Sequence, residues 1–170
     1  MKELLRKYIK ENLEVPKISI FSKMKTAFFE EEYVELDKNI PRECSTNINN
    51  FIDEHKNKYS NFQTLLFRLI EERNLTDPEV YNKVHFDRRQ FSKIRCNKNY
   101  HPSKETVILF GLSLELTIEE LEELLESASY SLPKNNYYDL IIRFCFINKI
   151  YKLTEVNDLL DEYNCKLFNY

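Results

Sequence analysis

A concentration of basic residues between Lys83 and Lys104 is the feature of this sequence with the clearest chemistry. The stretch contains one acidic residue, Asp87, and seven basic residues, which are Lys83, Arg88, Arg89, Lys93, Arg95, Lys98 and Lys104. Arginine and lysine bind phosphate groups, and arginine also forms paired hydrogen bonds to guanine. In contrast, residues 115–126 contain six glutamates and no basic residue. A basic surface beside an acidic one is therefore expected, although the formal net charge is only −3.

Helix-start residues and apolar spacing predict that the basic residues lie on and around a short helix. Two helices are predicted over residues 61–73 and 77–84, and the second opens with a capping box formed by Thr76 and Glu79. Asp87 can cap a third helix whose inward positions are Phe91 and Ile94. Its outward positions are Arg88, Arg89, Gln90 and Lys93.

Further helices are predicted on both sides of this segment. Residues 2–13 have helical apolar spacing, and a fourth and a fifth helix are predicted to begin after caps at Ser103 and Thr117. Two more follow Pro133, over residues 136–148 and after a cap at Thr154. The prediction is an all-α fold: a five-helix module with two additional C-terminal helices forming a hairpin, and an N-terminal extension.

The domain boundary is predicted near residue 47, dividing the chain into residues 1–46 and 47–170. Within the first part, residues 17–21 and 33–37 alternate weakly and are compatible with short strands, whereas residues 41–50 resemble a linker. The single glycine, Gly111, argues against a sheet-rich fold, because hairpin turns commonly use glycine. It also excludes a glycine-rich phosphate loop.

Several other classes of function find no support in the sequence. The four cysteines form no Cys-x-x-Cys pair and have no zinc-like spacing to the histidines, so no metal site is expected. No catalytic motif or cofactor fingerprint is present, so we predict neither an enzyme nor a bound cofactor. No apolar run reaches the roughly 18 residues of a membrane span, and charges run through the first 17 residues. These features predict a cytoplasmic protein.

Two short segments carry a resemblance to a known family. The run Phe91–Arg95, followed by Asn97–Ser103, resembles the recognition helix and the following loop of the phage repressor and Cro family of helix-turn-helix proteins. The resemblance covers about residues 62–128. It implies a DNA-binding module in which His85 stands where the family often has glycine, and Asp77 stands where it often has a phosphate-binding glutamine or serine.

The resemblance also implies a set of contacts with double-stranded DNA. The base-reading positions fall on Arg88, Arg89, Gln90 and Lys93. The positions for phosphate contacts fall on Arg95, Lys98 and Lys104, and Tyr100 in the loop completes the candidate interface. Because one such module reads few base pairs, the expected regulator is a homodimer bound to two half-sites, most simply a repressor.

A second resemblance supports the fold more than the function. Residues 47–167 resemble a helical domain without an assigned role that lies C-terminal to some bacterial macro domains, through Asp87, Arg88, the run Phe91–Arg95 and the stretch Tyr100–Lys104. An alternative function therefore stays open. The same architecture could bind a protein partner rather than DNA, within a bacterial stress or phage-defence or counter-defence system.

Overall fold

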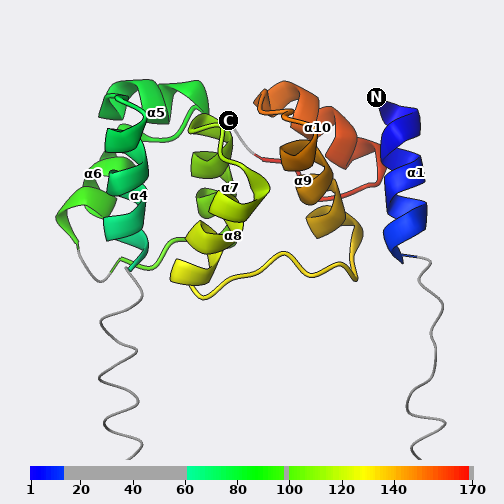
Figure 1. Ribbon diagram of the computed structural model, residues 1–170. Coiled ribbons are helices and arrows are strands. Elements are labelled where there is room, and N and C mark those ends of the chain that lie inside the picture. Colours follow the sequence, from blue (N-terminus) through cyan, green and yellow to red (C-terminus); the bar gives the residue numbers. More distant parts are fainter. Residues whose placement is uncertain (14–60, 98–99, 169–170) are drawn as a thin grey trace, which may run out of the picture. The chain divides into compact units, whose positions relative to one another are not determined.

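A computed structural model describes residues 1–13, 61–97 and 100–168, all of which belong to one compact unit. Over these ranges the only regular elements are helices, and no strand occurs, so the all-α prediction is confirmed (Figure 1). The helices are α1 (Lys2–Leu13), α4 (Phe62–Glu72), α5 (Asp77–Lys83), α6 (Arg88–Cys96), α7 (Lys104–Ser113), α8 (Ile118–Ser127), α9 (Tyr137–Ile147) and α10 (Leu153–Glu162).

The predicted strands, linker and domain boundary near residue 47 lie outside the described residues. None of the helices described is both long enough and apolar enough to cross a bilayer. The predicted cytoplasmic location stays a prediction.

Side-chain caps explain where most of these helices begin. The carboxylate of Glu79 accepts hydrogen bonds from the backbone N–H and the hydroxyl of Thr76, both at 2.7 Å. Asp87 accepts from the N–H of Gln90 at 2.9 Å, and a second capping box opens α8 at Thr117. These bonds satisfy N–H groups that have no partner within a helix. The cap predicted at Thr154 is wrong, because α10 begins at Leu153 with Lys152 at the cap position, so that Thr154 lies within the first turn.

The helix C-termini use left-handed residues other than glycine. Six such residues have φ between 51° and 61° and lie just after a helix; they are Asn74, His85, Glu115, Ser129, Lys149 and Asn164. At His85, the following N–H of Phe86 donates to the carbonyl of Tyr81 at 2.8 Å. This bond pattern is the Schellman motif, which ends a helix and turns the chain sharply. A single glycine therefore suffices for a chain with many tight helix connections.

That glycine, Gly111, lies where three helices meet in the core. A Cβ atom built on Gly111 would lie 2.7 Å from a methyl carbon of Leu121 on α8 and 3.1 Å from the ring of Phe146 on α9. Both neighbours are buried, so a side chain at this position would require them to shift within the core. Gly111 therefore allows α7 to pack closely against both helices.

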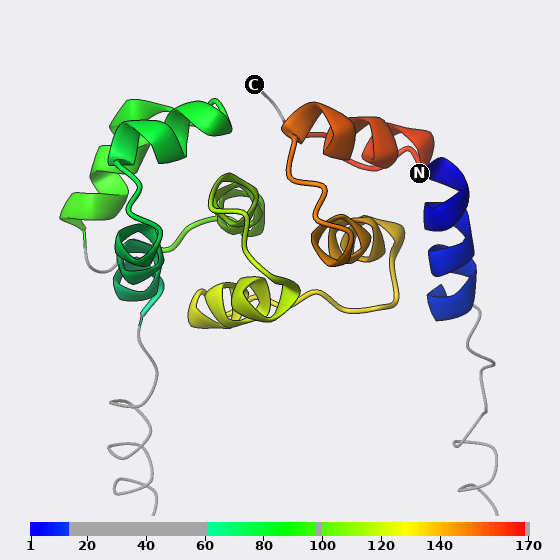
Figure 2. The same ribbon diagram turned by 45° about the horizontal axis from the view of Figure 1, so that its top comes forward.

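The N-terminal helix α1 packs against α9, and α10 also packs against α9, crossing it in Figure 2. Leu5 and Ile9 of α1 are buried, and the ring of Tyr8 lies 5.6 Å from that of Phe144. The guanidinium of Arg6 donates to Glu162 of α10 at 2.6 Å. Residues near the two ends of the chain thus share one core.

Candidate nucleic-acid interface

The inner face of α6 anchors this helix in the core. Phe91 and Ile94 are 2% and 0% exposed, as their spacing predicts. The Phe91 ring lies 5.6 Å from the rings of both Phe110 on α7 and Tyr81 on α5, and 6.1 Å from that of Phe67 on α4. Aromatic pairs at such distances and tilts stabilise each other beyond their burial. These contacts fix the outward direction of the opposite face of α6.

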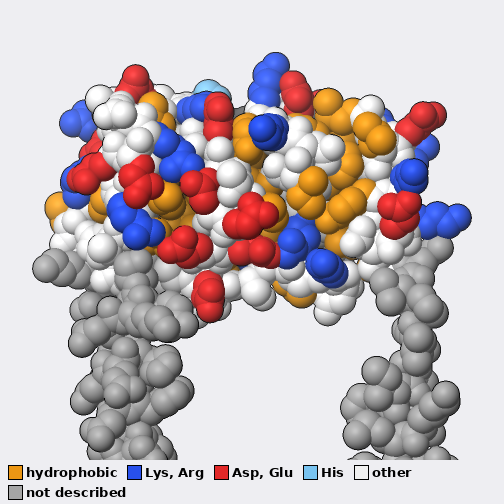
Figure 3. All heavy atoms as spheres, viewed as in Figure 1, with side chains coloured by type: hydrophobic (Ala, Val, Ile, Leu, Met, Phe, Trp, Pro, Cys, Tyr) orange, Lys and Arg blue, Asp and Glu red, His pale blue; other side chains and the backbone are white. Residues whose placement is uncertain are grey.

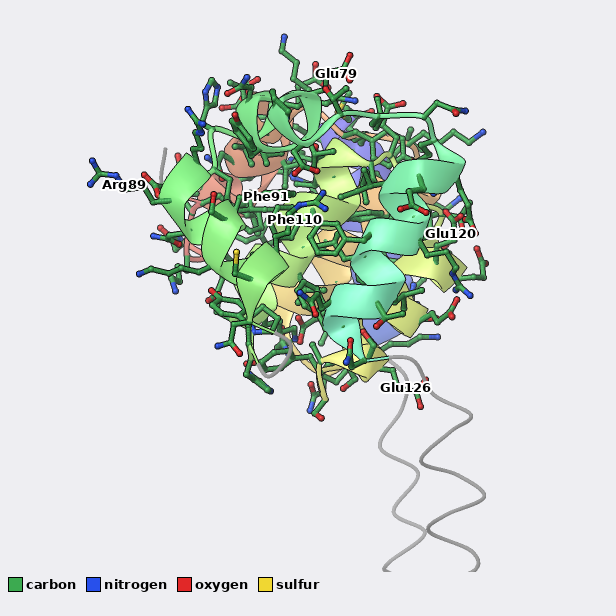
Figure 4. The ribbon with its side chains drawn as sticks, turned by 90° about the vertical axis from the view of Figure 1, so that its left-hand side faces the viewer. Glu79, Arg89, Phe91, Phe110, Glu120 and Glu126 are labelled. Atoms are coloured by element: carbon green, nitrogen blue, oxygen red, sulfur yellow. The ribbon has the colours of Figure 1, made fainter. Side chains whose placement is uncertain are left out.

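That outer face carries the four residues predicted to read bases. Arg88, Arg89, Gln90 and Lys93 are all exposed. Figure 4 shows Arg89 pointing away from the protein while Phe91 points inward to Phe110. Within residues 1–13, 61–97 and 100–168, the side chains of Arg88, Arg89 and Lys93 form no ion pair with a carboxylate. The face therefore offers three positive charges and one amide to a ligand.

Arg88 and Arg89 differ from the other described arginines because they have no carboxylate partner among the described residues. Each of the other arginines in the described ranges binds a carboxylate; these are Arg6, Arg68, Arg73, Arg95 and Arg143. Arg88 and Arg89 also occupy the first turn of α6, where the helix dipole is positive and disfavours a cation. Their position therefore does not serve the stability of the helix.

Arg95, in the last turn of α6, has a different environment. Its guanidinium is ion-paired with Asp77 of α5 and lies 4.2 Å from the centre of the Phe67 ring on α4. The carboxylate of Asp77, which would repel a phosphate, is thereby neutralised. Arg95 thus contacts protein groups at the point where we expected it to meet a DNA phosphate.

Lys104, at the start of α7, forms an ion pair that is more buried than that of Arg95. Its Nζ atom lies 2.6 Å from Oδ1 of Asp139 on α9, whose side chain is only 4% exposed. Asn136 donates to the other oxygen of Asp139 at 2.8 Å. Lys104 is therefore partly buried, and its charge is bound to a buried carboxylate. Of the other candidates, Tyr100 is partly buried, and Lys98 lies outside the described residues.

The acidic helix α8 does not neutralise the outer face of α6. Glu120, Glu122 and Glu123 instead bind arginines in or directly after α4 and in α9, namely Arg73, Arg143 and Arg68. Acidic side chains gather over α8 with basic ones beside them (Figure 3), and Glu120 and Glu126 lie well apart from Arg89 in Figure 4. Among the described residues, these glutamates therefore form no ion pair with Arg88, Arg89 or Lys93.

Sequence reasoning missed the buried pair of Lys104 and Asp139. A signal was available, because Asp139 is the only acidic residue of a helix that is otherwise almost entirely apolar. A carboxylate in such a helix needs a partner when the helix is buried. The identity of that partner depends on how α7 packs against α9, which local patterns do not encode.

The described residues offer little for other chemistry. Over these ranges, no group of three or more His, Cys, Asp or Glu side chains is arranged to hold a metal ion. Burial raises the pKa of the Cys145 thiol to about 12, which keeps it protonated and unreactive at neutral pH. Comparisons of the chain with models of protein families, with curated proteins and with solved structures found no match.

Proposed function

We propose that this protein binds double-stranded DNA through the outer face of α6 and acts as a transcriptional regulator of the helix-turn-helix type. One observation carries the proposal. Arg88 and Arg89 are exposed and without a carboxylate partner, whereas every other arginine in the described ranges has one. Lys93 and Gln90 of the same helix are also exposed and add a charge and an amide.

The chemistry of these side chains suits base edges in a major groove. Arginine can donate two hydrogen bonds to O6 and N7 of guanine, and glutamine can pair with N6 and N7 of adenine. Such readout requires a rigid helix, and the burial of Phe91 and Ile94 supports that requirement. In this proposal α5 and α6 form the two-helix unit, and two copies bind two half-sites as a repressor.

A second candidate function is binding to an acidic protein partner. It is favoured by the smaller basic surface that remains once Arg95 and Lys104 are paired with Asp77 and Asp139. Fewer available cations mean fewer phosphate contacts, and those contacts supply most of the non-specific affinity for DNA.

The test begins with the purified full-length chain and a pool of randomised duplexes at low salt. We expect enrichment of a defined sequence, which the protein then binds more tightly than a scrambled duplex in fluorescence anisotropy. The double variant Arg88→Ala with Arg89→Ala should lose most of this preference. A matched double variant, Lys10→Ala with Lys134→Ala, removes two exposed cations elsewhere that have no ion pair within the described residues, and it should keep the preference.

Two results would count against the proposal. The first is a wild-type protein that enriches no duplex at low salt. The second is an equal loss of binding in both double variants, because that would reflect net charge rather than a defined face. Either result would make the acidic protein partner the leading candidate.

A further inference from the structure

The C-terminal end of α6 is held from outside by a side chain of α4. The amide Nε2 of Gln63 donates to the backbone carbonyls of Ile94 and Arg95, at 2.8 and 2.6 Å. The last carbonyls of a helix have no partner within it. Gln63 therefore caps α6 from a neighbouring helix, which links the position of α6 to that of α4.

Arg95 makes a second link at the same end of the helix. Its guanidinium lies over the ring of Phe67, which is one helical turn after Gln63 on α4. The same guanidinium binds Asp77 in the first turn of α5. The planar group thus contacts α4 and α5 while belonging to α6. Three helices are tied together at one point, on the side of α6 away from its first turn.

We infer that Gln63 and Arg95 are positioning residues that set the angle at which α6 presents Arg88 and Arg89. This inference rests on the proposed function, in which the outer face of α6 reads bases. It assigns Arg95 a role different from the phosphate contact implied by family resemblance. The two roles have different consequences for binding, because a phosphate contact contributes equally to all sequences and a positioning residue does not.

The salt dependence of binding separates the two roles. Loss of a phosphate contact lowers the slope of log K against log salt by about one and weakens all duplexes alike. Loss of a positioning contact leaves the slope on a scrambled duplex unchanged, because the available cations are still there. It should instead reduce the preference for the selected duplex by about tenfold, a coupling typical of residues linked through a shared backbone shift.

The variants are Arg95→Met and Gln63→Ala, each compared with wild type on the selected and the scrambled duplex. Arg95 is about half exposed, so its replacement should leave the thermal unfolding of the protein nearly unchanged. Arg95→Lys keeps the charge but lacks the planar group that lies over Phe67, and we expect it to restore only part of the preference.

An exchange of the two charges gives a stricter test. The double variant Asp77→Arg with Arg95→Asp restores the ion pair but moves the positive charge of position 95 from α6 to α5. A positioning role predicts that it recovers more of the preference than Arg95→Asp alone. A phosphate-contact role predicts no recovery, because the cation has moved to another helix.

Hydrogen exchange in the free protein tests the positioning independently of DNA. Amides in the last turn of α6 should exchange faster in Gln63→Ala and Arg95→Met than in wild type, while those of α9 should not change. Unchanged exchange in α6, or a salt slope lowered by one with the preference intact, would overturn the inference. If wild type binds no duplex, the proposed function fails, and the exchange rates still decide whether these residues hold α6.

Discussion

Apart from Lys98, which lies outside the described residues, the basic residues from Lys83 to Lys104 divide into two groups with opposite environments. Arg88, Arg89 and Lys93 are exposed and have no carboxylate partner in the described ranges, whereas Lys83, Arg95 and Lys104 are bound to Glu115, Asp77 and Asp139. In the sequence the two groups are indistinguishable by residue type and lie within a few residues of each other. The comparison teaches that a basic run reports charge but not its availability to a ligand.

The burial of Asp139 prevents Lys104 from leaving its partner to bind a phosphate. Moving Lys104 towards an external phosphate would leave Asp139 charged, buried and short of one partner, which costs far more than a surface contact returns. Arg88 and Arg89 face no such barrier. The positive surface of the folded protein is therefore narrower than the sequence indicates and is centred on the first half of α6.

Removal of the buried ring under this surface should have the largest effect on stability. Phe91→Ala should lower the free energy of unfolding by about 3–5 kcal/mol, because it leaves a cavity between Phe110, Tyr81 and Phe67. Chemical denaturation monitored by circular dichroism measures this value. Phe91→Leu fills most of the cavity and should cost much less. If the alanine variant is as stable as wild type, α6 is not anchored as described, and the contrast between the two groups loses its basis.

A substitution of Lys104 tests the group of basic residues that are bound to carboxylates. Lys104→Met keeps the length of the side chain but leaves the buried carboxylate of Asp139 with Asn136 as its remaining side-chain partner. We expect a loss of about 3 kcal/mol in the free energy of unfolding, a value typical of a buried pair that loses one partner.

The double variant Lys104→Met with Asp139→Leu provides the control for this prediction. It removes both charges and should regain much of the lost stability. If Lys104→Met instead leaves stability intact and weakens DNA binding, Lys104 belongs with the available cations, and the division between the groups is misplaced.

The pairs formed by α8 should show a dependence on pH. Glu120 accepts two hydrogen bonds of 2.8 Å from the guanidinium of Arg73. Burial alone would raise the pKa of Glu120, but hydrogen bonds from the backbone of Thr117 and from Arg73 outweigh it and hold the pKa below its usual range. A carboxylate with a lowered pKa stabilises the fold at neutral pH, and this contribution is lost as the pH falls from neutral into the acidic range through the folded-state pKa.

The measurement compares the free energy of unfolding of Glu120→Gln with that of wild type across this pH range. At pH 7 the variant should be less stable by about 1 kcal/mol, since the pair is partly exposed. The difference should shrink in acid. Glu119→Gln, a change at an exposed neighbour without an ion pair in the described ranges, should give no such pH-dependent difference. A difference that stays constant with pH would mean that the ion pair does not contribute.

Much of the fold could be predicted from local sequence patterns. The caps at Thr76, Asp87, Ser103 and Thr117 all mark helix starts, because cap bonds are made within three residues. The left-handed helix ends were harder to predict, since residues such as Glu115 and Lys149 have no special preference for that conformation. There the requirement comes from the following apolar residue, which must turn back into the core.

The candidate site was predictable in part for the same reason. The three-residue spacing of Phe91 and Ile94, with polar residues between them, determines which face of α6 is outward. The engagement of Arg95 and Lys104 was not predictable, because Asp77 is 18 residues away from the first and Asp139 is 35 residues away from the second. Which carboxylate meets which cation depends on helix packing, and helical periodicity gives no information about it.

The smallest predicted effect on stability concerns Arg88 and Arg89 themselves, and it is a gain rather than a loss. Arg88 and Arg89 lie at the positive end of the α6 dipole and bind no carboxylate in the described part of the chain, so their charges disfavour the folded state slightly. Alanine has at least as high a helix propensity as arginine. The double variant Arg88→Ala with Arg89→Ala should therefore be as stable as wild type or more stable, by up to about 0.5 kcal/mol.

The gain should appear at low salt and fade as the salt concentration rises, because the interaction is screened. Lys10→Ala provides a control of opposite sign, since Lys10 lies in the last turn of α1, where the dipole favours a cation. A loss of more than about 1 kcal/mol in the double variant would show that Arg88 or Arg89 makes contacts that stabilise the fold, and the two groups would then no longer differ in kind. A gain in stability together with a loss of DNA preference would show that Arg88 and Arg89 contribute to binding but not to the stability of the fold. This combination of a small cost to stability and a gain in binding is expected of side chains that serve a ligand.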